Sequence, residues 1–268
     1  MYVRKPSWWW DWSWNPVGGC KPISPGCRDC LVPPWLQGHT WETETVHTGV
    51  IKVVRGRPVW TGNLTTSPDG DPMWTWPLTW PGVENPALGP GKPSLIFVVV
   101  LGDLFAEGRP TKDIDRVCAT IAQSDHIGLL VTKYTKQMAA YFAALDPRTV
   151  RRWKLKLWLC FSAERQREFD QRWTDLRRLA EAGWFVFTSL APLIAPVTLP
   201  QDFLELGRWV IVNGEQAPRD RCHLLKPAWA RAICDQCAEA RIPLFMKGMH
   251  RNVPRPPDLR IRQFPSVP

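Results

Sequence analysis

Short apolar runs recur through the second part of the chain, with longer amphipathic stretches between them. Most runs are rich in β-branched or aromatic residues, which is typical of strands buried on both faces. One further short strand is expected before Cys20, so the total is six or seven. The remaining expected strands are Leu95–Leu101, Ile127–Val131, Leu155–Cys160, Trp184–Thr188, Trp209–Val212 and Ile242–Met246.

The stretches between the runs have the apolar spacing of helices that cover one face of a sheet. Ile114, Val117, Cys118 and Ile121 follow an i, i+3, i+4, i+7 pattern, which gives one apolar stripe. Similar stripes are Met138, Tyr141, Phe142 and Leu145; Phe169, Trp173, Leu176 and Ala180; and Trp229, Ile233, Cys237 and Ala240. Strands that alternate with helices predict a parallel sheet with crossover connections. This α/β pattern favours a partial barrel over a closed eight-stranded one.

The rest of the chain is irregular, and we expect a single domain over residues 1–268. It would comprise a Trp-rich start with a cysteine loop (1–35), an irregular Pro- and Trp-rich insertion (47–93), the alternating strands and helices (94–250) and a basic tail (251–268). The longest strong apolar run, Leu95–Leu101, is far shorter than the roughly 18 residues of a membrane span. No secretory signal follows Arg4 and Lys5, so we expect a cytoplasmic protein with no membrane partner.

Polar residues follow the carboxyl end of nearly every expected strand. Loops at that end of βα barrels build the active site, so a shared rim site is expected. An ordinary polar loop is the alternative reading of each single residue. The rim candidates are Asp103, Thr132, Lys133, Ser162, Glu164, Ser189, Asn213, Gly214, Glu215 and Lys247.

The loop after the first expected strand contains Cys20, Cys27 and Cys30 in the spacing C-x6-C-x2-C. Eight cysteines in a reducing compartment favour metal binding or burial over disulfides. Thiolates are soft, anionic donors for iron–sulfur clusters. Three protein ligands on a four-iron cluster leave one iron open to S-adenosylmethionine, whose cleavage by one electron releases a 5′-deoxyadenosyl radical. The spacing therefore predicts a radical enzyme.

Zinc is the alternative metal. Cys27 and Cys30 together with Cys234 and Cys237 have the two CxxC pairs of a four-thiolate zinc site. Cys237, however, lies on an apolar helix stripe, where a buried thiol is common. A non-catalytic, zinc-stabilised DNA-binding protein is thus a second possible reading.

The charge and the tryptophans favour a polyanionic partner. The formal net charge is +9, and 17 tryptophans are a large excess whose rings suit stacking on bases. Packing is the competing role for these rings, and we expect the cluster between Trp8 and Trp14 to cap the barrel rather than to fill the gap left by a flipped base. The candidate phosphate contacts are Arg148, Arg151, Arg152, Lys154, Lys156, Arg251, Arg255, Arg260 and Arg262.

Six ordered segments resemble a phage-associated family of radical S-adenosylmethionine-like proteins, long catalogued as a domain of unknown function. The first is the start of the chain, where Trp14-Asn15-Pro16-Val17 leads to Cys20 and Ser24-Pro25-Gly26-Cys27 precedes Cys30. The others are Ile96–Phe105, Leu129–Lys133, Leu157–Glu164, Trp209–Glu215 and the final stretch from Gln236 to Lys247. The sequence departs from the family at Leu31, Asn213 and Tyr134.

The resemblance implies a partial (β/α)6 barrel of the radical S-adenosylmethionine kind, a 4Fe-4S cluster and S-adenosyl-L-methionine. It brings the protein near spore photoproduct lyase and implies DNA, most simply phage DNA with a modified thymidine-type base, as the substrate. Building a modification and repairing a photoproduct both remain open, as does a peptide or small-metabolite substrate. An external electron donor such as flavodoxin or ferredoxin, a monomer and the host cytoplasm are also expected.

The resemblance assigns roles at the rim. Cys20, Cys27 and Cys30 hold the cluster, Glu164 or Glu215 accepts the methionine ammonium group, and Lys133 or Lys247 binds its carboxylate. Ser162, Asn213 and Asp103 are candidates for ribose or substrate contacts, and Ser189 and Gly214 complete the cofactor-binding set. The expected catalytic residues are Asp103, Lys133 and Tyr134.

Overall fold

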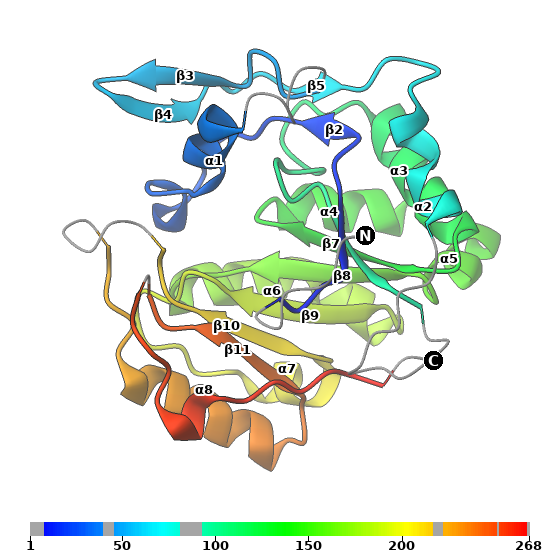
Figure 1. The fold of residues 1–268 in the computed structure, drawn as a ribbon. Coiled ribbons are helices and arrows are strands. Elements are labelled where there is room, and N and C mark those ends of the chain that lie inside the picture. The colour runs from blue at the N-terminus through cyan, green and yellow to red at the C-terminus, as the bar shows by residue number, and fades with distance from the viewer. Residues whose placement is uncertain (1–7, 40–45, 81–92, 217–221, 251, 267–268) are drawn as a thin grey trace.

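Seven short strands run parallel in one sheet, and their order in space is their order along the chain. The computed structural model describes residues 8–39, 46–80, 93–216, 222–250 and 252–266. The sheet is curved and open, because its first and last strands are its two edges (Figure 1). The strands are β1 (Trp12–Trp14), β6 (Leu95–Val98), β7 (Ile127–Thr132), β8 (Leu157–Ser162), β9 (Phe185–Leu190), β10 (Val210–Asn213) and β11 (Leu244–Gly248).

Helices cover the outer face of the sheet (Figure 1). Four of them contain the predicted apolar stripes: α3 (Thr111–Gln123), α4 (Thr135–Ala143), α6 (Gln166–Glu181) and α8 (Pro227–Glu239). The shorter ones are α1 (Val32–Gly38), α2 (Trp76–Thr79), α5 (Pro147–Trp153) and α7 (Gln201–Leu206). In the described parts of the chain, no helix combines the length and the apolar character needed to cross a membrane.

The prediction of a partial α/β barrel is confirmed, with seven strands rather than the six of the implied barrel. The strand ends differ by up to three residues from those expected. The first long run ends at Val98 because Val99 adopts a positive φ of 57°, which extended backbone does not allow. The strand predicted to begin at Leu155 begins at Leu157 instead, because Leu155 lies in an exposed turn.

Alternation along the strands gives the sheet two different faces. Its outer face packs against the helices in one large core, which includes Ile96, Leu159 and Met246. The inner face holds a second, mainly aromatic cluster with Trp158 and Phe245. This inner cluster fills the barrel from the amino-terminal ends of the strands.

The N-terminal tryptophans complete the inner cluster. Trp9 is 3% exposed, and its ring meets those of Phe97, Phe187 and Trp209 at centroid distances of 5.3, 5.9 and 5.6 Å. Trp10 is also buried there and lies edge-on to Trp9. Packing inside the barrel, as expected, is therefore the role of both side chains.

The irregular insertion contributes two small antiparallel pairs on the same side of the molecule as α1 (Figure 1). One is the hairpin of β3 (Ile51–Val54) and β4 (Arg57–Trp60), and the other pairs β2 (Val17–Gly18) with β5 (Thr65–Thr66). The insertion thus contains one hairpin among its irregular segments. Residues 81–92 of the predicted insertion lie outside the described residues.

We expect Trp9→Ala to destabilise the fold by about 3–5 kcal/mol, because it removes a large buried ring and leaves a cavity between three aromatic neighbours. The free energy of unfolding from urea denaturation measures this loss. Trp76→Ala is the matched control, since Trp76 is 42% exposed and its removal should cost within about 0.5 kcal/mol. Equal effects of the two substitutions would contradict the packing role of Trp9.

Candidate functional site

The three cysteines of the predicted cluster loop lie beyond the carboxyl end of β1. Gly19 pairs with Gly102 after β6, and its φ of +89° would place a Cβ 2.0 Å from the carbonyl oxygen of Asn63. Only glycine fits this close approach, so the chain enters the loop at a fixed point. Cys27 ends a single 3-10 turn, and Cys30 stands two residues before α1.

Glu164, after β8, fastens this loop to the sheet. Its side chain is fully buried, and its Oε1 accepts a hydrogen bond from the backbone N–H of Gly26 at 3.1 Å. Its Oε2 accepts one from Arg172 Nη1 at 2.8 Å. Burial opposes ionisation of Glu164, but Lys133 and Arg172 outweigh it and lower the carboxyl pKa. Glu164 was expected to bind the methionine ammonium group, but both of its oxygens already have partners within the protein.

Asp103, in the segment after β6, holds the end of β7 and the residue that follows it. Asp103 Oδ1 accepts hydrogen bonds from Thr132 Oγ1 at 2.7 Å and from the N–H of Phe105 at 2.9 Å, and its Oδ2 accepts one from the N–H of Lys133 at 3.3 Å. Burial raises the pKa of Asp103 to about 6. Asp103 therefore orients neighbouring backbone, and its expected contact with the substrate stays a prediction.

Tyr134 and Lys133 reach the cysteine loop directly. The Tyr134 hydroxyl donates a hydrogen bond to the carbonyl oxygen of Lys21 at 2.5 Å. Lys133 Nζ lies 3.5 Å from Cys27 Sγ. Of the three residues expected to be catalytic, Lys133 is thus the one beside a cluster-loop thiol, while the Tyr134 hydroxyl is occupied in anchoring the loop.

The three thiols differ in their readiness to ionise. Burial raises the pKa of Cys20 and of Cys30, and nearby thiolates raise both further. Burial also opposes ionisation of Cys27, but the Lys133 ammonium group and hydrogen bonds in the loop lower its pKa below the ordinary value. The cysteines therefore lie close enough to influence one another, and Lys133 stabilises the thiolate that it faces.

The donor set fits an iron–sulfur cluster. The three cysteines of the loop are free and half-buried, and thiolates are the donors that such clusters prefer. No three His, Cys, Asp or Glu side chains of the described residues are arranged around a position for a single metal ion. Thiolates around a four-iron cluster stand farther apart than those around one ion. A four-iron cluster bound by this loop would have three protein thiolates and one iron without a protein ligand.

The two CxxC pairs of the alternative zinc site do not come together. Cys237 is buried under α8 in the main core, and Cys234 on the same helix packs against that core. Cys30 belongs instead to a small separate cluster beside α1. The four-thiolate arrangement is therefore not formed in the described structure.

Four of the predicted cofactor-binding residues share the inner face of the barrel, directly above the aromatic cluster. Each stands two residues after an inner-face aromatic or apolar residue on its strand, so alternation turns its side chain inward. Ser162 and Ser189 are paired in register on β8 and β9. These residues are Ser162, Ser189, Asn213 and Lys247.

Lys247 is the cation of this polar layer. Its Nζ lies 5.0 Å from the ring centroid of Trp10, and no carboxylate of the described residues is within ion-pair distance. Burial lowers the pKa of Lys247 to about 8. An ammonium group held in this way favours an anionic ligand.

The turn after β10 explains two further predicted residues. A Cβ on Gly214 would lie 1.7 Å from the carbonyl oxygen of Met249, so glycine permits the close approach of the turn to the end of β11. Glu215 is buried, and its Oε2 accepts a hydrogen bond from the N–H of His223 at 2.6 Å and lies 3.1 Å from His223 Nδ1. Glu215 thus faces the site with one oxygen engaged.

Two residues near the candidate site were not identified in the sequence analysis. Arg172 stands beside Trp173 in the apolar stripe of α6, and this charge within a stripe was the available signal. His250 follows β11, is 8% exposed, and has no hydrogen-bond partner on either ring nitrogen among the described residues. Nothing in its sequence context distinguishes it from the other histidines.

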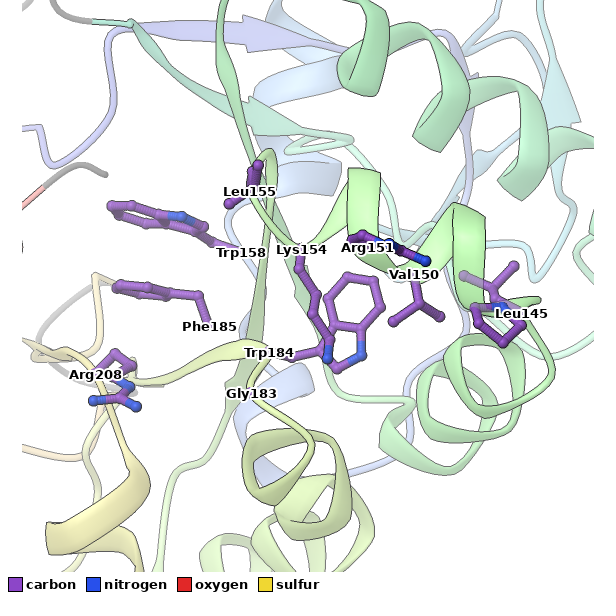
Figure 2. A pocket seen from close by; sticks show the side chains of 11 residues that line it. Leu145, Val150, Arg151, Lys154, Leu155, Trp158, Gly183, Trp184, Phe185 and Arg208 are labelled. Carbon is purple, nitrogen blue, oxygen red and sulfur yellow. The ribbon is translucent and has the colours of Figure 1, made fainter.

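The predicted basic edge lies at the opposite end of the strands, where it borders a pocket of about 720 Å3. Figure 2 shows Trp158 and Phe185 face to face in this pocket; their ring centroids are 3.8 Å apart. Arg151, Lys154 and Arg208 also line it. The pocket is at the amino-terminal ends of β8 and β9, so it is not part of the cysteine site. Of the predicted tail cations, Arg251 lies outside the described residues.

Comparisons with known proteins give one family and one solved structure. The chain is similar to a double mutant of spore photoproduct lyase with bound AdoMet and dinucleoside spore photoproduct, at 15% identity and a TM-score of 0.46. The alignment covers 90% of this chain but only 64% of that chain. No curated protein matches the sequence. A family model described as protein of unknown function, DUF5131, matches residues 6–255, and the chain therefore belongs to the DUF5131 family.

Proposed function

We propose that this protein binds a four-iron cluster through Cys20, Cys27 and Cys30 and uses it to cleave S-adenosylmethionine. The single observation that carries the proposal is the position of the three free thiols: one loop holds them at the carboxyl end of β1, on the side where the inner polar layer opens. In α/β barrels this end of the strands is where active sites are built.

The residues around the loop fit this task. Glu164 and Tyr134 fix the loop backbone through hydrogen bonds, so the three thiols are held before a ligand arrives. Lys133 offsets part of the negative charge that several thiolates create. A reduced cluster held there would supply the electron that breaks a carbon–sulfur bond of S-adenosylmethionine.

The inner polar layer offers the contacts that S-adenosylmethionine requires. The hydroxyl groups of Ser162 and Ser189 and the amide of Asn213 suit the ribose, and Lys247 suits the methionine carboxylate. Glu215 is the remaining candidate for the methionine ammonium group, because Glu164 is engaged by the loop and Arg172. The aromatic layer beneath closes the lower barrel, which keeps water from the reacting groups.

We propose a base in DNA, of the thymidine type, as the substrate. The net charge of +9 supports a polyanionic partner, and the resemblance noted in the sequence supports the thymidine type. Building a modified base and restoring a damaged one would use the same radical chemistry. The nucleoside products separate these two outcomes.

Anaerobically purified protein is expected to be brown and to contain iron and sulfide. Cys27→Ala should lose most of both, because two thiolates hold a cluster weakly. Cys234→Ala is the matched control and should keep the iron, since Cys234 lies on α8, away from the loop. Iron and sulfide analysis measures the effect. A protein that contains zinc and no iron, and that loses the zinc to the same extent in both variants, would contradict the proposal. This result would support the alternative zinc site.

With a reductant and S-adenosylmethionine, the same preparation is expected to release 5′-deoxyadenosine, which liquid chromatography detects. Added DNA should yield a new or restored nucleoside in mass spectrometry. A protein that holds iron and sulfide but never cleaves S-adenosylmethionine would show that the cluster serves another purpose.

Gly26→Ala should weaken the cluster loop. The new Cβ would lie 3.2 Å from Lys133 Nζ and 3.3 Å from the Glu164 carboxyl carbon, so both neighbours must move. We expect a cost of about 1–3 kcal/mol in the free energy of unfolding and a clear fall in bound iron. Gly38→Ala is the control, because nothing lies within 4 Å of its Cβ. Normal iron in Gly26→Ala would argue against a loop held by Glu164.

Lys247 should make stability depend on pH. The pKa of Lys247 is about 8 in the folded protein, which is below its pKa in the unfolded chain. At a pH between these two pKa values, the unfolded chain binds one more proton than the folded protein. Stability relative to Lys247→Met should therefore rise as pH increases from 7 to about 10, by at most about 3 kcal/mol. Urea denaturation of the unsubstituted protein and of Lys247→Met at each pH measures the difference between their free energies of unfolding. The contributions of the other titrating groups cancel in this difference. A decrease of this relative stability with rising pH would instead indicate that the Lys247 ammonium group forms a stabilising ion pair.

A further inference from the structure

A second cavity opens beside the cysteine loop and extends beyond the contacts described so far. It has a volume of about 740 Å3 and lies between the ends of β10 and β11 and the C-terminal tail. Leu31, the residue after Cys30, forms part of its wall. Asn213 and Lys247 of the inner polar layer form another part. The cavity therefore adjoins the proposed reaction site.

The wall of this cavity is strongly basic. Lys247, Arg255 and Arg260 line it, and no Asp or Glu is among the described residues of the wall. Arg255 donates one hydrogen bond, from Nη1 to the carbonyl oxygen of Met246 at 2.6 Å. Burial lowers the pKa of Arg255, and the neighbouring Arg262 and Arg260 lower it further. Like charges gathered in this way favour an external anion.

His250 adds a polar group that lacks a partner. Its ring lines the cavity and is 8% exposed, and both nitrogens are unpaired within the described structure. Leaving buried polar atoms unpaired is destabilising, so a native structure seldom keeps them without a ligand or water. One ring nitrogen can donate a hydrogen bond whichever tautomer is present. A ligand with acceptor oxygens would satisfy it.

We infer that this cavity binds a phosphate group of a nucleotide substrate through Arg255 and Arg260, with His250 donating to the same group. A guanidinium fork matches the spacing of phosphate oxygens, and the cavity is larger than a phosphate alone requires. This site favours a nucleotide or a nucleic-acid strand as the substrate over a peptide or a free nucleoside. This inference rests on the proposed function and names the substrate class of that site.

Equilibrium binding to the full chain tests the inference with four probes: oligothymidylate, thymidine 5′-monophosphate, thymidine and inorganic phosphate. The variant is Arg255→Gln with Arg260→Gln. Its control is Lys112→Gln with Arg178→Gln, which removes two exposed charges from α3 and α6 on the outer face of the sheet. We expect the first variant to bind oligothymidylate and the monophosphate about 10- to 100-fold more weakly, with thymidine unchanged and the control within about twofold.

Arg260→Gln alone gives a second measurement, because Arg260 is exposed and its loss leaves the backbone contact of Arg255 in place. Like the double variant, Arg260→Gln should bind the monophosphate more weakly than the unsubstituted protein does. Thermal unfolding confirms that both variants are folded.

Three results would overturn the inference. The first is unchanged binding of the nucleotides in the folded variants. The second is a loss of thymidine binding as large as that of the monophosphate, which would assign the two arginines to the nucleoside and not to its phosphate. The third is equal affinity for inorganic phosphate and for the monophosphate, which would make free phosphate the ligand. Because these assays need no iron, they fail or succeed separately from the iron and 5′-deoxyadenosine measurements that test the proposed function.

Discussion

The carboxylate of Glu164 is the contact on which the candidate site depends. It is fully buried, and it joins three elements: the N–H of Gly26 in the cysteine loop, the guanidinium of Arg172 on α6, and the end of β8 from which it extends. Removing one partner of a buried ion pair leaves an uncompensated charge and is strongly destabilising. The loop is thus fixed to the sheet by a contact that tolerates little change, and this rigidity prepares the three thiols for a shared ligand.

Much of the fold follows from apolar patterns. The seven strands and four longer helices were predicted from local periodicity, because buried strands and helix stripes leave different spacings in the sequence. The inner polar layer was also predictable, since Ser162, Ser189 and Lys247 stand at the carboxyl ends of strands. Strand ends were less predictable: the positive φ of Val99 is set by tertiary contacts, including the hydrogen bond from its N–H to Trp14.

The roles of single charged residues were harder to foresee. Whether a carboxylate is free for a ligand depends on which partners reach it in three dimensions. Asp103 and Glu164 looked alike in the sequence, as polar residues after strands, yet both are occupied by donors distant in the chain. The excess of tryptophan was equally ambiguous. Many of these rings are packing residues of the core: Trp9, Trp10, Trp14, Trp60, Trp74, Trp153, Trp158, Trp173, Trp184 and Trp209.

The contact between Trp9 and Trp209 has a consequence for how the chain reaches its native state. The two rings meet inside the barrel, although they lie far apart in the sequence. Contacts between such distant parts of a chain form slowly, because a long loop must close first. We therefore expect the inner aromatic cluster to be completed late in folding, after the outer helices have packed on neighbouring strands.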